Sequence, residues 1–145
     1  MSLKDWSRSG WLLPHETDRE EIQNLLDIAD RDLKDSGVSA LSNDWRLNIA
    51  YNAALQLATA ALAVAGFRST RERHHYQTIQ SLAHTIGAEP KVVHSREKFR
   101  KKRNVGGYEQ AGMASDIEVK EMRSLAAELR AAVEDWIQRT RPDLL

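Results

Sequence analysis

The chain has no cysteine, only three prolines and a formal net charge of +0. The missing cysteines exclude a disulfide framework and a thiolate metal site, and they fit a reducing compartment. Because 21 basic and 21 acidic residues balance, any electrostatic preference for nucleic acid must be local. No apolar run approaches the roughly 20 residues that span a bilayer, and the first residues lack the apolar core and cleavage site of a signal peptide. We therefore expect a cytoplasmic protein without membrane contact.

The 145 residues fit one domain with a sizeable core. We expect an irregular N-terminal arm over residues 1–15, in which Trp6 and Trp11 pack onto the body or onto a partner. A single helical domain is expected over residues 16–141. No segment alternates with the period of two that is typical of strands.

Three capping-box patterns, each a hydroxyl residue followed three positions later by glutamate, mark helix starts at Thr17, Ser69 and Ser115. Ser42 or Asn43 is the expected cap of a long, apolar helix that ends before Gly66, and Pro90 suits a first helical turn. The apolar spacing predicts helices over residues 18–35, 43–65, 71–86, 90–104 and 116–139. The predicted fold is all-α, an antiparallel up-and-down bundle of four to five helices.

A narrow polar strip lies beside the apolar face of the second long helix. It consists of Asn48, Asn52 and Thr59. We interpret it as helix–helix hydrogen bonding or water contact. His84 also has a structural interpretation. It precedes Gly87, so we interpret it as the partner of a helix C-terminus.

The densest charge run is KFRKKRNVGGY, residues 98–108. At 100° per residue, Arg103 shares a helix face with Val92 and Phe99, whereas the lysines lie on the other side. An inward arginine needs an acceptor, which is a carboxylate of a neighbouring helix, a helix C-terminus or a bound phosphate. Asn104 stands where the helix ends, and Gly106 and Gly107 allow a turn that returns Tyr108 towards Arg103.

These residues resemble the HEPN superfamily, the higher eukaryotes and prokaryotes nucleotide-binding domains. The resemblance rests on the segment from Asn48 to Leu55, on the motif Arg103-Asn104-x-x-x-Tyr108 and on the order of the helices. It implies a small all-α bundle that forms a homodimer. Many members are metal-independent ribonucleases of toxin type, and others are non-catalytic partners of small nucleotidyltransferases.

The resemblance also implies roles for individual residues. Arg103 would contact a phosphate, and Asn104 would orient the Arg103 side chain. Tyr108 would donate a hydrogen bond, and Arg96 and Lys102 would add supporting charge. Tyr108 stands where the ribonucleases have histidine, and its reference pKa near 10 makes it a poor general base at neutral pH.

Three functions follow from these residues. The first is binding of nucleotide or RNA, as the partner of a small nucleotidyltransferase. The second is a toxin-type endoribonuclease with an antitoxin-like partner, in which Arg103 acts with Tyr108, His74 or His75. The third is a structural interaction module whose N-terminal tryptophans grip a partner. No metal site and no cofactor are expected.

Overall fold

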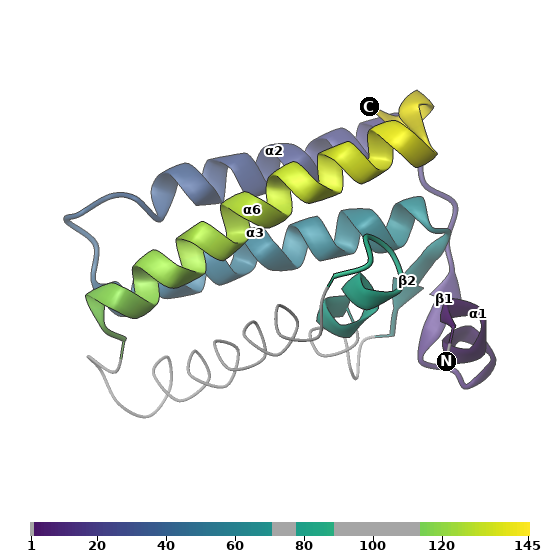
Figure 1. Cartoon of the computed structure of the whole chain (residues 1–145), viewed down its shortest axis with the longest axis horizontal. Coiled ribbons are helices and arrows are strands. Elements are labelled where there is room, and N and C mark those ends of the chain that lie inside the picture. Colours follow the sequence, from purple (N-terminus) through teal and green to yellow (C-terminus); the bar gives the residue numbers. More distant parts are fainter. Residues whose placement is uncertain (1, 71–77, 89–113) are drawn as a thin grey trace.

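The computed structural model describes residues 2–70, 78–88 and 114–145. Three long helices form the body: α2 (Arg19–Asp35), α3 (Asn43–Val64) and α6 (Asp116–Thr140) lie side by side in Figure 1. Arg130 bonds Asp30 and Arg123 bonds Ser36, so α6 runs antiparallel to α2. A bond from Asn43 to Asp116 joins the starts of α3 and α6, which therefore run parallel. The prediction of an all-α helical bundle is confirmed.

The helix starts follow the capping chemistry in the sequence. Ser42 caps α3 by accepting a bond from the Trp45 N–H, and Ser115 and Glu118 form the complete capping box of α6. The cap of α2 differs from the prediction, because Asp18 and not Thr17 accepts the Glu21 N–H. The hydroxyl of Thr17 is bonded to the Glu21 carboxylate instead.

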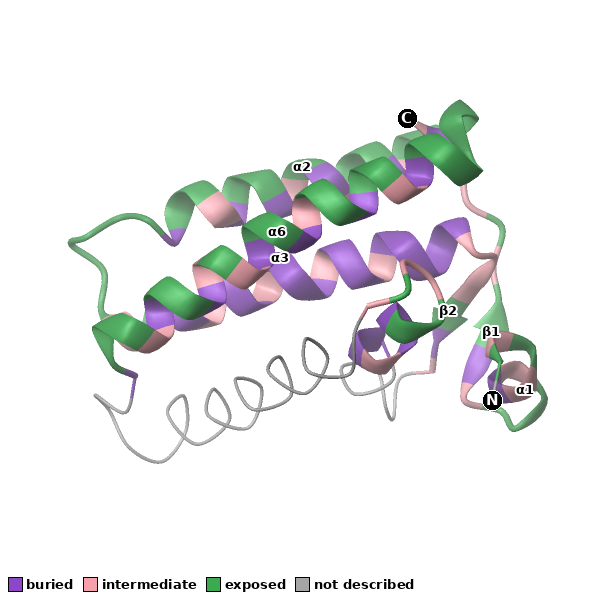
Figure 2. Ribbon diagram, viewed as in Figure 1, coloured by how far each residue is buried: buried purple, intermediate pink, exposed green. Residues whose placement is uncertain are grey.

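Helix α3 is the centre of the core. Figure 2 shows it buried along most of its length between α2 and α6, whose outer faces are exposed. Its many alanines allow close approach from several sides, as expected of a helix that is apolar beyond one stripe. By length and composition α3 could also cross a membrane, but 72% of its most apolar stretch is buried inside the bundle. Core helices of globular proteins commonly have the same length and composition.

The N-terminal arm is ordered, and the expectation of an irregular arm is wrong. Residues Leu3–Arg8 form helix α1, and Leu12–Pro14 form strand β1, which pairs antiparallel with strand β2 (Phe67–Ser69). Figure 1 shows this unit at one end of the three-helix body. The pairing joins segments far apart in the sequence, so local periodicity gave no sign of it.

A second, smaller core fixes this arm. It contains Trp6, Leu12 and Leu62, and Trp6 is only 8% exposed. The Trp6 ring meets Trp11 and His84 edge to face, with centroids 5.9 and 5.0 Å apart. Trp6 therefore packs onto the body of its own chain. His84 packs against the Trp6 ring. The interpretation of His84 as the partner of a helix C-terminus did not include this contact.

Short 3₁₀-helices complete the described chain, η2 (Ser81–Ala83) and η3 (Pro142–Leu144). Of the helix predicted over residues 71–86, the described part begins at residue 78 and continues into η2. The helix predicted over residues 90–104 lies outside the described residues.

Candidate functional site

The residues predicted to form the site lie outside the described part of the chain. These are His74, His75, Arg96, Lys102, Arg103, Asn104 and Tyr108. Their roles therefore stay predictions. The described structure begins again at Ala114, just before α6. The contacts of Ala114 show at which end of the bundle the chain resumes.

The junction is anchored to the first turn of α3. The Ala114 N–H donates to Oδ1 of Asp44 at 3.1 Å. One residue away, Asn43 Nδ2 donates to Oδ1 of Asp116 at 2.8 Å. The chain thus enters α6 beside the start of α3 and close to the end of α2. We call this region, where α2 ends and α3 and α6 begin, the α2 C-terminal end.

Two arginines from different helices converge on Ser36, the C-cap of α2. Arg46 of α3 donates its Nε–H to the Ser36 carbonyl at 2.9 Å, and Arg123 of α6 donates its Nε–H to the Ser36 hydroxyl at 3.0 Å. Ser36 is fully buried, and its hydroxyl also donates to the Leu33 carbonyl. These bonds satisfy acceptors at the helix end and place two positive charges near its negative dipole end.

Gly37 makes room for the second arginine. A Cβ at this position would lie 2.7 Å from Nη2 of Arg123 and 3.2 Å from the Lys34 carbonyl. The sequence predicted that Ser36 and Gly37 stop the helix, which they do. A side chain at this position would have to displace the guanidinium of Arg123, which is the end of a flexible side chain.

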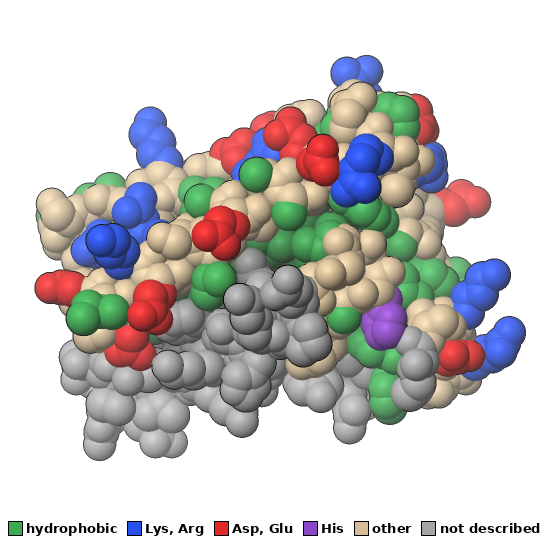
Figure 3. Space-filling view, in the orientation of Figure 1, with side chains coloured by type: hydrophobic (Ala, Val, Ile, Leu, Met, Phe, Trp, Pro, Cys, Tyr) green, Lys and Arg blue, Asp and Glu red, His purple; other side chains and the backbone are tan. Residues whose placement is uncertain are grey.

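The two guanidinium groups keep binding capacity. Within the described residues, no carboxylate forms an ion pair with Arg46 or Arg123, and their terminal nitrogens are not among the buried unsatisfied atoms. Figure 3 shows Lys and Arg side chains near this end of the molecule, above acidic and apolar ones at the start of α6. Arg46 and Arg123 are half-buried, and guanidinium N–H groups that lack a partner are donors for an oxyanion such as phosphate.

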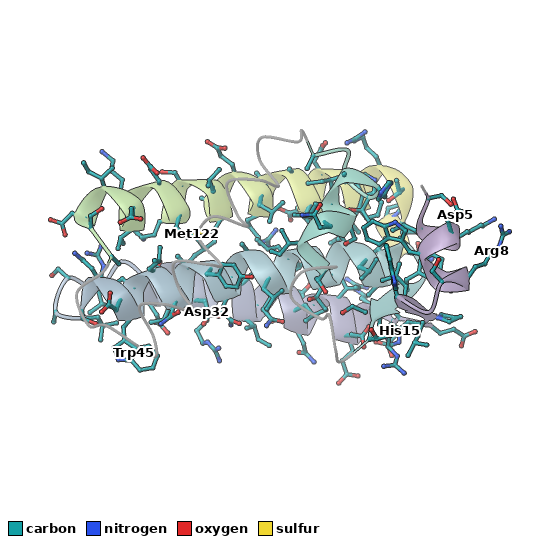
Figure 4. The ribbon with its side chains drawn as sticks, turned by 90° about the horizontal axis from the view of Figure 1, so that it is seen from below. Asp5, Arg8, His15, Asp32, Trp45 and Met122 are labelled. Carbon is teal, nitrogen blue, oxygen red and sulfur yellow. The ribbon has the colours of Figure 1, made fainter. Side chains whose placement is uncertain are left out.

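An exposed tryptophan stands at the same end. Trp45, in the first turn of α3, is 63% exposed, and Figure 4 shows its ring projecting away from the body. Ile117, in the first turn of α6, is 69% exposed.

A second polar cluster joins α2 to α3. Asp32, whose side chain is 8% exposed, accepts bonds from Arg31 Nη2 at 3.0 Å and from Asn52 Nδ2 at 2.6 Å. Gln56 Nε2 in turn donates to Asn52 Oδ1 at 3.3 Å. The polar strip therefore includes helix–helix hydrogen bonding, as one of its two interpretations predicted. Among the described residues, Thr59 bonds within its own helix, to the Leu55 carbonyl at 2.8 Å.

A third cluster holds the arm against α2. His15 Nε2 lies 2.8 Å from Oε1 of Glu21, and the Thr17 hydroxyl donates to the same oxygen at 2.6 Å. Partial burial alone would raise the pKa of Glu21, but the bonds from Thr17 and His15 outweigh it and hold that pKa below its ordinary value. No group of three or more metal-ligating side chains occurs in the described segments. The third cluster thus consists of the Glu21 carboxylate and its two donors, His15 and Thr17.

No protein-family model, curated protein or solved structure matches the chain. The resemblance to the HEPN superfamily consequently rests on the residues themselves. Sequence reasoning missed the convergence of Arg46 and Arg123, because residues far apart in the chain form it. The one available signal was local: Ser36-Gly37 at a helix end, next to a serine-capped helix that carries an arginine in its first turn.

Proposed function

We propose that the protein is a HEPN-like domain that binds nucleotide or RNA, acts as a homodimer and serves a small nucleotidyltransferase as a non-catalytic partner. In this proposal Arg103 contacts a phosphate group and Asn104 orients the Arg103 side chain. Tyr108 donates a hydrogen bond to the ligand. Arg96 and Lys102 add positive charge. The chemistry required is recognition of an anion, for which arginine is well suited because its planar N–H groups match phosphate oxygens.

The observation that supports this proposal is the arginine pair at the α2 C-terminal end. Arg46 and Arg123 present terminal nitrogens there without carboxylate partners in the described chain. Ala114 is bonded to Asp44 at the same end. In this proposal Arg46 and Arg123 supply further N–H donors for the bound phosphate.

The test is incubation of the purified protein with single-stranded RNA in the presence of a chelator. The proposal predicts that the RNA stays intact and that nucleotide or RNA binding is measurable at low salt and falls as salt rises. Cleavage that disappears in Arg103→Ala would instead establish the metal-independent endoribonuclease. Absence of both binding and cleavage, with a loss of stability in Arg103→Ala, would give the arginine a structural role and refute the proposal.

A further inference from the structure

Large apolar side chains that face solvent gather at one end of the molecule. Five of them are exposed in the described residues, and four lie at the α2 C-terminal end: Val38, Leu41, Trp45 and Ile117. The fifth, Leu13, belongs to β1 at the opposite end of the three-helix body (Figure 1). Single exposed apolar residues are ordinary on a protein surface, whereas a concentration of them at one place indicates an interaction surface. We call the four residues the apolar end surface.

The backbone that carries the apolar end surface is fixed by hydrogen bonds. In the loop between α2 and α3, the Leu41 N–H donates to the Val38 carbonyl at 3.2 Å. The Trp45 N–H donates to the hydroxyl of Ser42, the residue after Leu41, at 3.2 Å. The first turn of α6, which carries Ile117, is joined to the first turn of α3 by the bond between their side chains. The surface is therefore ordered before a partner binds, which reduces the entropy lost on association.

The exposed charges at this end have both signs. In the last turn of α2 and the first two turns of α6, the exposed carboxylates are those of Asp35, Asp116 and Glu121, and the exposed ammonium groups are those of Lys34 and Lys120. A strongly acidic or strongly basic partner would leave one of these sets without a counter-charge. A second copy of the chain suits both sets, because a twofold axis places the surface against itself and lets positive groups of one subunit face negative groups of the other. The formal net charge of +0 also adds no long-range repulsion between two copies.

We propose that the apolar end surface is the interface between two copies of this chain, related by a twofold axis. This inference rests on the proposed function, which includes a homodimer, and it names the surface through which the dimer forms. Trp45 is the aromatic anchor of this interface, because tryptophans that become buried between two proteins commonly carry a large share of the binding energy. Val38, Leu41 and Ile117 add apolar area around it, and the charged side chains form the rim.

Sedimentation equilibrium of the full chain measures the dimer dissociation constant of wild type and of a matched pair of variants. Leu41→Ala and Leu13→Ala remove the same side chain, with the same exposed fraction of 37%, from opposite ends of the molecule. We expect Leu41→Ala to raise the dissociation constant about tenfold, because each substitution acts twice in a symmetric dimer, and Leu13→Ala to leave it within about twofold of wild type. Trp45→Ala should raise it at least about thirtyfold. Circular dichroism checks that each variant keeps its helices.

Cross-linking locates the interface independently, because the chain has no cysteine of its own. The single-cysteine variants Ile117→Cys and Leu13→Cys are each treated with a flexible bismaleimide at a concentration where wild type is dimeric. We expect a covalent dimer from Ile117→Cys and none from Leu13→Cys.

Two results overturn the inference. If Leu41→Ala and Trp45→Ala dimerise as wild type does, or if Leu13→Cys cross-links and Ile117→Cys does not, the interface lies elsewhere and the homodimer of the proposed function stands. If wild type stays monomeric at about 100 μM, a different partner occupies this end, and the homodimer fails together with the inference. Binding of nucleotide or RNA is measured separately on wild type and Arg103→Ala, so failure of the proposed binding function is distinguishable from both results.

Discussion

The backbone N–H of Ala114 lies 3.1 Å from Oδ1 of Asp44, a residue 70 positions earlier in the chain. This bond fixes the entry of α6 to the first turn of α3. Beside it, Arg46 and Arg123 meet at Ser36. The α2 C-terminal end is therefore held by side-chain bonds among three helices. It carries the arginine pair, the carboxylates of Asp44 and Asp116 and the exposed Trp45.

Replacement of Asp44 by alanine releases the junction at Ala114. A net hydrogen bond contributes about 1 kcal/mol, so we expect amide exchange at Ala114 to become about five times faster. Asp44→Asn is the matched control, because its amide oxygen can still accept the bond. Hydrogen exchange followed by NMR measures the effect. Equal protection of Ala114 in the alanine variant and wild type would show that the bond does not hold this junction in solution.

Removal of the Asn52 side chain deprives a buried carboxylate of a donor. We expect Asn52→Ala to lower the free energy of unfolding by about 1–3 kcal/mol, because Asp32 then keeps only Arg31 as its partner. Gln23→Ala is the control, since Gln23 bonds Asp27 at 3.0 Å on an exposed surface and its loss should cost below about 0.5 kcal/mol. Urea denaturation measures both. Similar losses in the two variants would mean that the Asp32 network adds nothing to stability.

A methyl group at Gly37 collides with Arg123. We expect Gly37→Ala to displace the guanidinium from Ser36 and to cost about 1 kcal/mol, the net value of a hydrogen bond. The cost should fall in an Arg123→Met background, where the obstructing group is absent. A double-mutant cycle in urea detects this coupling. Full additivity of the two substitutions would contradict the close contact between Gly37 and Arg123.

The pH dependence of Glu21 has a defined sign. Its pKa is lowered in the folded state, so its bonds add stability above the unfolded-state pKa, and this contribution is lost as the pH falls through the folded-state value. We expect Thr17→Val to lower stability at pH 7 by less than about 1 kcal/mol, because Glu21 is partly exposed. The difference from wild type should shrink below about pH 4. Thr59→Val is the control, since its hydroxyl bonds a neutral carbonyl and its effect should not change with pH. A Thr17→Val deficit that is constant from pH 7 to pH 3 would show that the bond to Glu21 is not its source.

The sequence predicts the long helices, because their bounds depend on interactions between residues close together in the chain. The bounds of α2, α3 and α6 follow from apolar spacing and from hydroxyl caps such as Ser42 and Ser115. In the described segments the cap predicted at Thr17 is misplaced, because the adjacent Asp18 is an equally good acceptor. These features are readable because each depends on residues within one helical turn.

Contacts between distant segments could not be predicted in the same way. The β1–β2 pair and the packing of Trp6 against His84 join parts of the chain that share no local period. The arginine pair at Ser36 is another such contact. The predicted ligand residues, from Arg96 to Tyr108, lie outside the described residues, and their roles depend on helix phase and on the resemblance to the HEPN superfamily.

The most direct test of the central claim compares Arg103→Ala with Lys101→Ala in equilibrium binding of a single-stranded oligoribonucleotide at two salt concentrations. In the helix predicted over residues 90–104, Arg103 is expected to face inward and Lys101 outward, so the two variants would remove the same charge from opposite faces. The proposed function predicts that Arg103→Ala loses at least tenfold in affinity at both concentrations, whereas Lys101→Ala loses about twofold or threefold, mainly at low salt. Equal losses in the two variants would show that the basic stretch binds only as a charged surface and would contradict a specific phosphate contact at Arg103.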